Sequence, residues 1–200
     1  MIYSKRLSYR LMSPEDVNAF KNWGRHKSSL YDDYNFYEES PEEILNWYSW
    51  KTARGKYFTV FLKGDPIGYI SFKNIRRLTG SSVLGLVFNP DLVGKAYGEE
   101  TLVTMLDNYF NKWRFKKIYL RVAAYNKRAL ALYKKLGFSK YASFMQSYPN
   151  DEPDPYDPEY LENKESFFKI FGKTFFYGDK MVLDKDTFNE VVKCISNYKI

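Results

Sequence analysis

The most regular feature of the chain is a series of short apolar runs separated by glycine, proline and polar clusters. Runs rich in β-branched and aromatic residues are typical of β-strands. Turn residues at Gly64-Asp65-Pro66 and Thr79-Gly80 predict that three of these runs form an antiparallel meander. We expect strands at 6–11, 57–62, 67–75, 82–88, 118–123, from 138 onward and at 174–183.

Between these runs, apolar residues recur at three- and four-residue spacing, which is typical of amphipathic helices. Serine–proline pairs and Asn126 mark helix starts, and Gly137 marks a helix end. We expect helices at about 14–24, 41–55, 98–113, 127–136 and 186–198.

The order of these elements predicts a mixed α/β (α+β) fold. A crossover from strand 82–88 through the helix at 98–113 to strand 118–123 should make those two strands parallel. With 200 residues the chain is long enough for one good core and too short to argue for two. We therefore expect a single domain spanning residues 1–200.

Composition narrows the class of protein. Hydrophobic residues make up 44% of the chain and aromatic residues 20%, which predicts a packed globule and excludes extensive disorder. No apolar run approaches the ~18 residues of a membrane helix, and the N-terminal segment has no signal-peptide core. Cys194 is the only cysteine, so we expect no disulfide, no cysteine-based metal site and a cytoplasmic location.

The chain has a formal net charge of +7, and its charged residues are unevenly distributed along the sequence. Such a balance suits nucleic-acid or ribosome contact, and equally a site that holds a polyphosphate. The exception is an acidic, proline-rich segment, 149–170, in which we expect Pro153, Pro155 and Pro158 to exclude helix and central strand. We interpret this segment as a surface loop inserted in the domain, either merely solvated or facing the substrate.

The most informative segment joins strand 82–88 to the helix at 98–113. Its turn contains Gly94, Ala96 and Gly98, and leads directly into the helix. Unpaired N–H groups at a helix start, with the positive end of the helix dipole, form an anion site, and small residues allow a phosphate to approach. Lys95 could add a charge. The alternative is a plain strand-to-helix connection; the P-loop and dinucleotide motifs are both missing.

Two segments together resemble the GNAT superfamily of N-acetyltransferases. The turn Val93-Gly94-Lys95-Ala96-Tyr97-Gly98 is similar to the family's Q/R-x-x-G-x-G/A signature, and 126–138, NKRALALYKKLGF, resembles its N…A…xYxKLGF pattern. The resemblance covers roughly residues 7–144 and resumes near 177–181. The chain departs from the family at Val93 and Ala96, and neither change removes a backbone donor.

Membership of this family would imply a mostly antiparallel sheet of six to seven strands with helices on both faces. Its fourth and fifth strands would be parallel and would splay apart, with acetyl-coenzyme A between them. The pantetheine arm would follow Leu86, Val87 and Phe88, and Asn126 would lie near it or serve only as a helix cap. The diphosphate would bind the N–H groups of Gly94, Lys95, Ala96, Tyr97, Gly98 and Glu99.

The resemblance also implies catalytic roles. Tyr133 would give a proton to the departing thiolate, and a backbone N–H near Val87 would stabilise the oxyanion. Tyr133 is otherwise a core aromatic residue on its helix. No carboxylate lies on 81–88, so the general base would be a water chain or one of the groups outside that strand, which are Asp32, Asp33, Glu38, Glu39 and the single histidine, His26.

The function implied is transfer of an acetyl group from acetyl-coenzyme A to a primary amine on a protein N-terminus, a polyamine or an aminoglycoside-like molecule. The alternative is a catalytically silent coenzyme A-binding module that contacts ribosome or RNA through Arg76-Arg77 and the basic cluster 114–117. We expect a small-molecule or peptide partner, no membrane and no metal; nucleic acid is disfavoured, and a homodimer is left open.

Overall fold

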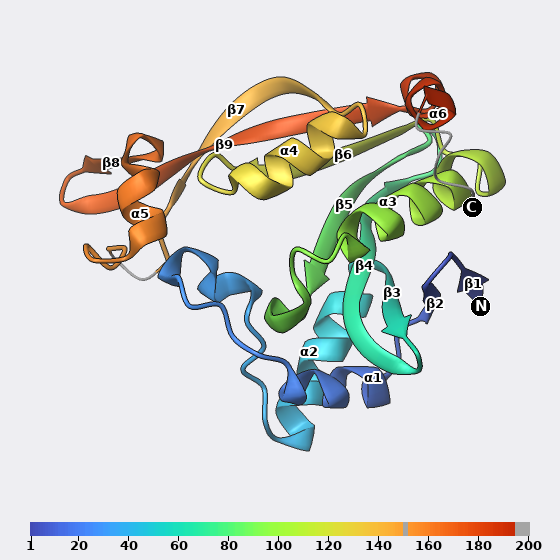
Figure 1. The fold of residues 1–200 in the computed structure, drawn as a ribbon, viewed down its shortest axis with the longest axis horizontal. Helices are drawn as coiled ribbons and strands as arrows, with labels where there is room; N and C mark the ends of the chain where they lie inside the picture. Colours follow the sequence, from blue (N-terminus) through green and yellow to red (C-terminus); the bar gives the residue numbers. More distant parts are fainter. Residues whose placement is uncertain (150–151, 195–200) are drawn as a thin grey trace.

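The computed structural model describes residues 1–149 and 152–194. Its described strands form one nine-stranded sheet in the order β1-β2-β3-β4-β5-β6-β9-β7, with β8 paired to β9 (Figure 1). The strands are β1 (Ile2–Tyr3), β2 (Leu7–Leu11), β3 (Gly55–Leu62), β4 (Asp65–Arg76), β5 (Ser81–Phe88), β6 (Lys117–Ala123), β7 (Ser139–Ser147), β8 (Phe167–Ile170) and β9 (Lys173–Asp184).

The sheet is the expected mixed, mostly antiparallel one. Neighbouring strands pair antiparallel except β5 and β6, which are parallel, so the meander and the parallel crossover are both confirmed. The seven expected strands are all present, and the short strands β1 and β8 raise the number from six or seven to nine. Because β1 has two residues and β8 four, neither produces a clear apolar run.

Helices cover both faces of the sheet, as expected. Residues of α3, α4 and α6 pack on the face that holds the main core, whereas α1 and α2 contribute to a second cluster with Tyr57 and Tyr69. The helices are α1 (Pro14–Ala19), α2 (Pro41–Thr52), α3 (Tyr97–Asp107), α4 (Lys127–Lys135), α5 (Pro158–Glu162) and α6 (Lys185–Cys194), with the 3-10 turns η1 (Phe20–Asn22), η2 (Ser29–Tyr34), η3 (Pro90–Leu92) and η5 (Lys164–Ser166) and the π-helical turn η4 (Asn108–Lys112).

Several helix boundaries differ from expectation. The helix expected at 14–24 ends at Ala19 and continues as η1, and the helix expected at 41–55 ends at Thr52. The helix expected at 98–113 begins at Tyr97 and widens into η4 after Asp107, where the Asn108 side-chain amide donates to the Thr104 carbonyl at 2.8 Å. Such a side-chain bond competes with the backbone ladder. The last helix is described only to Cys194, so the remainder of the predicted 186–198 segment lies outside the described residues. None of the described helices is long and apolar enough to cross a membrane.

The sheet opens between β5 and β6. These strands are paired only at Ser81–Val83 with Lys117–Tyr119, and beyond that point they diverge (Figure 1). One half of the sheet, β1 to β5, therefore meets the other, β6 to β9, in a V. Within the described part of the chain, the edge of β5 from Leu84 to Phe88 has no partner strand on the β6 side. The splayed arrangement implied by the resemblance is thus present.

A buried tyrosine holds the closed end of the V. The hydroxyl of Tyr109 donates to the Lys117 carbonyl of β6 at 2.8 Å and accepts from the Ser82 hydroxyl of β5 at 3.0 Å. The Gly80 carbonyl also accepts from the N–H groups of Lys116 and Lys117, at 2.7 and 3.1 Å. Because Tyr109 is fully buried, its hydroxyl would otherwise have no water to bind. These bonds fix the angle at which the strands part.

The acidic segment lies beside η2 and includes α5, η5 and β8 (Figure 1). The expectation that its prolines exclude a helix is wrong at Pro158, which occupies the first position of α5. At that position a helix needs no N–H group and proline's fixed φ is already helical. Residues 150–151 lie outside the described part. The segment is therefore a folded element, not only a solvated loop.

Asp157 anchors this segment to η2. It is 6% exposed, and its Oδ2 accepts from the Ser28 hydroxyl at 2.6 Å and from the N–H and hydroxyl of Ser29 at 2.9 and 3.2 Å. Its Oδ1 accepts from the Glu159 N–H at 2.9 Å and so caps α5. Burial alone would raise the pKa of Asp157, but these hydrogen bonds hold it below the usual value. One carboxylate thus joins the two elements.

Tyr109→Phe should destabilise the fold by about 1–3 kcal/mol, because it leaves a buried hydroxyl and a buried carbonyl without their partner. The free energy of unfolding in urea measures this loss. Tyr141→Phe is the matched control, since Tyr141 is exposed on β7 and makes no hydrogen bond among the described residues. Equal stability of the two variants would show that the bridge does not hold the strands.

Asp157→Asn should destabilise the fold by about 1–3 kcal/mol at pH 7, because charge-assisted hydrogen bonds are lost. Since the folded-state pKa of Asp157 is depressed, its contribution is present above the unfolded pKa and disappears as pH falls below about 4. The difference between variant and parent should therefore shrink in acid, as followed by urea denaturation at several pH values. Asp154→Asn, at an exposed position of the same segment, should show no such pH dependence.

Candidate active site

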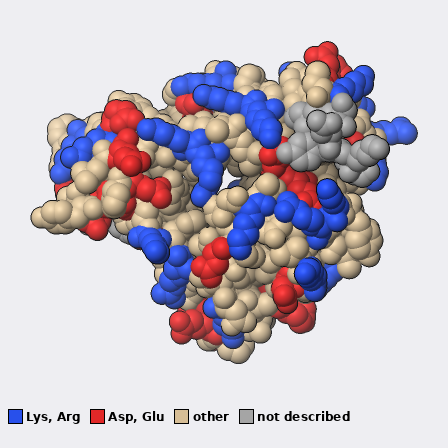
Figure 2. All heavy atoms as spheres, viewed as in Figure 1, with Lys and Arg blue, Asp and Glu red and all other residues tan. Residues whose placement is uncertain are grey.

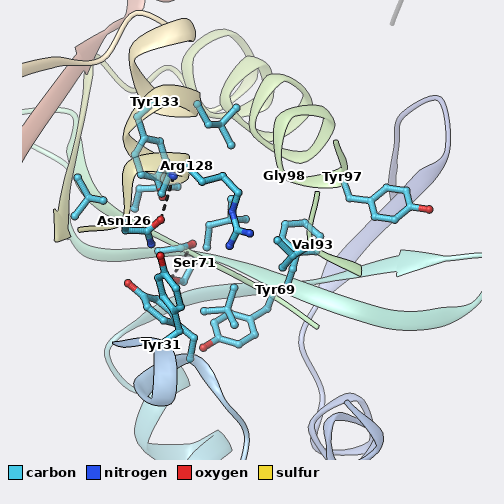
Figure 3. A pocket seen from close by; sticks show the side chains of 18 of the residues that line it. Tyr31, Tyr69, Ser71, Val93, Tyr97, Gly98, Asn126, Arg128 and Tyr133 are labelled. Carbon is cyan, nitrogen blue, oxygen red and sulfur yellow. Dashed lines mark hydrogen bonds between the residues drawn. The ribbon is translucent and has the colours of Figure 1, made fainter. Parts of the chain in front are cut away.

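A cavity of about 520 Å³ lies where the V opens, and several parts of the chain line it. One wall is the segment of η2 with His26, and the floor comes from β3, β4 and β5. The turn before α3, the start of α4 and residues of α2 and β6 complete it. Figure 3 shows Asn126, Arg128 and Tyr133 on α4 across from Tyr31 of η2. Of the predicted site residues, those lining the cavity are Leu86, Val87, Phe88, Gly94, Ala96, Tyr97, Gly98, Glu99, Asn126 and Tyr133, and Lys95 does not.

The turn before α3 presents a row of free donors. Gly94 and Ala96 have φ of 87° and 61°, a left-handed conformation that glycine adopts freely and alanine only at a cost of about 1–2 kcal/mol. The first capping bond of the helix runs from the Glu100 N–H to the Ala96 carbonyl. Within the described chain, the N–H groups of residues 94–99 have no acceptor. Such a strained turn with unpaired donors suits a bound anion.

An ion pair holds the turn against the N-terminal strands. Arg6 Nε donates to Glu100 Oε2 at 2.6 Å, and Arg6 also reaches the Lys95 carbonyl at 3.3 Å. Burial would raise the pKa of Glu100, but hydrogen bonds from Ser4 and Arg6 hold it low. The guanidinium of Arg6 lies 4.6 Å from the Tyr97 ring centre, so the side chain of Tyr97 points away from the cavity (Figure 3). Tyr97 can serve there through its backbone only.

The carboxylate nearest the anion site is already paired. Glu99 lies in the first turn of α3 and lines the cavity. Its Oε1 lies 2.6 Å from Lys135 Nζ, at the end of α4. The pair ties the two helices together, and it offsets the repulsion that a bare carboxylate would exert on an anion at this helix start.

The strand register shows which β5 groups face the opening. The Asn89 N–H donates to the Ile67 carbonyl, which precedes Gly68 of β4. Because successive N–H groups of a strand point to opposite sides, the N–H groups of Val87 and Gly85 also point to β4. The N–H groups of Leu86 and Phe88 therefore face the gap toward β6. The expectation that the main chain near Val87 faces the opening holds for its two neighbours, while the N–H of Val87 itself is directed to β4.

At the start of α4, Asn126 acts as the N-cap. Its Oδ1 accepts from the Ala129 N–H at 3.1 Å, which is the plain structural alternative left open above. Its side chain also lines the cavity, so capping does not remove it from the site. Burial raises the pKa of Tyr34 in η2, and the nearby side chain of Asn126 opposes this effect without reversing it. Sequence reasoning did not select Tyr34.

Tyr133 lies about two helical turns after Asn126 and also lines the cavity. Burial raises the pKa of its hydroxyl well above the usual 10, and the nearby Tyr34 adds to the effect. The phenol is therefore protonated at neutral pH and can only donate a proton. Its ring also packs edge-on to Phe138 at 5.5 Å, so Tyr133 serves the core as well as lining the cavity.

Of the five candidate bases, the structure brings two to the cavity. His26 and Asp33 line it, whereas Asp32, Glu38 and Glu39 do not. Burial lowers the pKa of His26, and the charge of Arg128 lowers it further, against smaller opposing effects of Glu159 and Asp32. His26 is therefore neutral at pH 7 and able to accept a proton.

Sequence reasoning missed the basic lining of the cavity. Lys51, Lys73, Arg121 and Arg128 all line it, and Figure 2 shows Lys and Arg side chains around a hollow in this face. Arg128 reaches from α4 toward the cavity in Figure 3. Arg76-Arg77 and the cluster 114–117 do not line it. Among the described residues, no three or more His, Cys, Asp or Glu side chains are grouped so that they could hold a metal ion.

Comparison with known proteins identifies the family. Residues 6–139 match the acetyltransferase (GNAT) domain family. A spermidine N(1)-acetyltransferase of Vibrio cholerae serotype O1 is 23% identical over 139 residues, which is 68% of this chain and 80% of that protein.

Solved structures share the fold. A spermidine N-acetyltransferase of Vibrio cholerae in complex with CoA and spermine superposes with a TM-score of 0.63 at 18% identity, covering 93% of this chain and 99% of the other. A dodecameric structure of the Vibrio cholerae enzyme gives a TM-score of 0.63 at 20% identity, covering 92% and 97%. With the free donors of the turn, the splayed strands and the match over residues 6–139, this chain belongs to the acetyltransferase (GNAT) domain family and is an N-acetyltransferase that uses acetyl-coenzyme A.

Proposed function

We propose that the cavity at the opening of the V is the site where a primary amine attacks the thioester of acetyl-coenzyme A directly. The observation that carries the proposal is the row of free N–H groups at 94–99, adjacent to the unpaired edge of β5. The N–H groups of the turn could hold the diphosphate, and the edge of β5 could pair with the pantetheine amides. Both the turn and the strand edge present N–H groups without an acceptor in the described chain, and one ligand satisfies them together.

The transfer needs a donor for the oxyanion and a proton for the leaving group. When the amine attacks, a C–N bond forms, the C–S bond breaks and negative charge passes from the carbonyl oxygen to the thiolate sulfur. In our proposal the N–H of Leu86 or Phe88 stabilises the oxyanion, in place of Val87, because these face the opening. Tyr133 then protonates the thiolate. Asn126 holds the start of α4 where Tyr133 can act.

A base must remove a proton from the attacking amine. We assign this role to His26, because burial keeps it neutral and it lies on the cavity wall. Asp33 is the second candidate, on the same wall. Its carboxylate could instead hold the amine in position by charge.

The comparisons suggest which acceptor amine should be tested first. The relatives named above are spermidine acetyltransferases, so spermidine is the first acceptor to test. Release of the thiol from acetyl-coenzyme A, measured over spermidine, aminoglycosides and peptides with free N-termini, ranks the acceptors. Absence of thiol release with every amine would contradict the proposed function.

Tyr133→Phe should lower kcat by about 10²-fold while the affinity for coenzyme A stays within a few-fold, because a proton donor acts only in the chemical step. Steady-state kinetics and calorimetric titration with coenzyme A measure the two quantities. Tyr141→Phe, on the exposed side of β7, is the control. An unchanged kcat in Tyr133→Phe would exclude the phenol as the donor.

His26→Gln should remove the acidic limb of the kcat/KM profile. In the parent enzyme kcat/KM should fall as pH drops through the pKa of His26, which lies below 6.5, because the protonated ring cannot accept a proton. Asp33→Asn should keep this limb and raise the KM for the amine. If the limb persists in His26→Gln and disappears in Asp33→Asn, then the two roles are reversed.

A further inference from the structure

Two lysines lie on the acceptor side of the cavity, away from the anion-binding turn. Lys73 is on β4 opposite Val83 of β5, and Lys51 comes from α2. A Cβ placed on Gly85 would lie 3.5 Å from Lys73 Nζ and 2.6 Å from Ser71 Oγ, so the ammonium of Lys73 lies over the bare backbone of Gly85. The turn that precedes α3 follows the other end of β5. These lysines are therefore not placed to hold the diphosphate.

Neither lysine is neutralised within the described chain. Lys73 has no ion pair, hydrogen bond or ring contact there. Lys51 contacts only the rings of Trp47 and Trp50, at 5.0 and 5.1 Å from their centres. Burial lowers the pKa of both lysines. The charge of Lys73 lowers the pKa of Lys51 further, against an opposing effect of Glu38. Lys73 is thus a half-buried cation with no carboxylate acting on it, and an anion bound beside it and Lys51 would be favourable.

The other charged groups that line the cavity do not pair with these lysines. Asp33 and His26 lie on the η2 wall, where the attacking amine would be held and deprotonated. Glu99 is paired with Lys135, and Arg121 and Arg128 add further positive charge to the lining. A second ammonium of an acceptor such as spermidine, placed against Lys51 and Lys73, would be repelled.

We propose that Lys51 and Lys73 form an anion subsite, and that the acceptor is a primary amine carrying an anionic group such as a carboxylate or phosphate. This inference rests on the proposed function and names the class of its acceptor. On β5, Gly85 precedes the two candidate oxyanion donors, Leu86 and Phe88, by one and three residues, which corresponds to about 3 and 10 Å along a strand. The anionic group would lie within that range of the reacting amine, so an acceptor with four or five bonds between the groups fits.

The test compares amines that differ only at the far end. With the purified enzyme and acetyl-coenzyme A, kcat/KM is measured by thiol release for 5-aminopentanoate, 5-aminopentanamide, 4-aminobutylphosphonate and spermidine. We expect the carboxylate to exceed the amide by at least about tenfold, as for charge-assisted hydrogen bonds. A phosphonate better than the carboxylate would identify the anion as a phosphate. Equal values for carboxylate and amide, or a preference for spermidine, would overturn the proposal.

Variants of the two lysines show which residues cause the preference for the carboxylate over the amide. Lys73→Gln and Lys51→Gln should each bring the carboxylate-to-amide ratio of kcat/KM close to one, mainly through the KM of the carboxylate. Lys56→Gln, an exposed position on neighbouring β3, should keep the parent ratio. Thermal denaturation and coenzyme A titration confirm that each variant is folded, and the parent comparison stands even if one is not.

The outcomes separate the two proposals. If neither lysine variant changes the ratio, the subsite is wrong although transfer still occurs. If none of the amines leads to thiol release from acetyl-coenzyme A, the proposed function itself fails. A loss of kcat with amide and carboxylate alike in Lys73→Gln would place that lysine in the chemistry and overturn the subsite.

Discussion

The site depends on one constraint, the short closed end of the parallel pair β5 and β6. Three residue pairs and the hydroxyl of Tyr109 join the strands there, and the remainder of β5 has no neighbour on that side. Because backbone groups of a buried strand must be hydrogen-bonded, this edge needs either water or a ligand. The fold thereby offers a strand-shaped gap of fixed angle, with the anion-binding turn at the end of β5.

Each wall of this gap is held by its own charged anchor. Arg6 and Glu100 fix the turn before α3 to the N-terminal strands, and Asp157 fixes η2 to the acidic segment. The acidic segment, for which a substrate-facing role was one interpretation, therefore uses the buried carboxylate of Asp157 for structure. The charge that faces the cavity is instead basic, from α2, β4, β6 and α4. For this reason, the net charge of a sequence segment does not predict the sign of the charge that faces the cavity.

Much of the fold could be predicted because it depends on local signals. Periodicity gave the strands and most helices, and the two family-like segments indicated the turn and Tyr133. What could not be predicted depends on contacts between distant residues. Examples are Asp157 with Ser28, and Lys73 over Gly85. Pro158 shows the limit of a residue rule, since proline excludes helix interiors but favours the first position. Val87 shows that the strand was identifiable, whereas the direction of each N–H required the register.

Amide hydrogen exchange of β5 followed by NMR tests the central claim most directly. If the opening of the V holds the cofactor, the amides of Leu86 and Phe88 should exchange fast in the free protein and slowly with coenzyme A bound. The amide of Val87, bonded to β4, should exchange slowly in both states. Amides of Leu86 and Phe88 that are already protected in the free protein, or that do not respond to coenzyme A, would contradict the account.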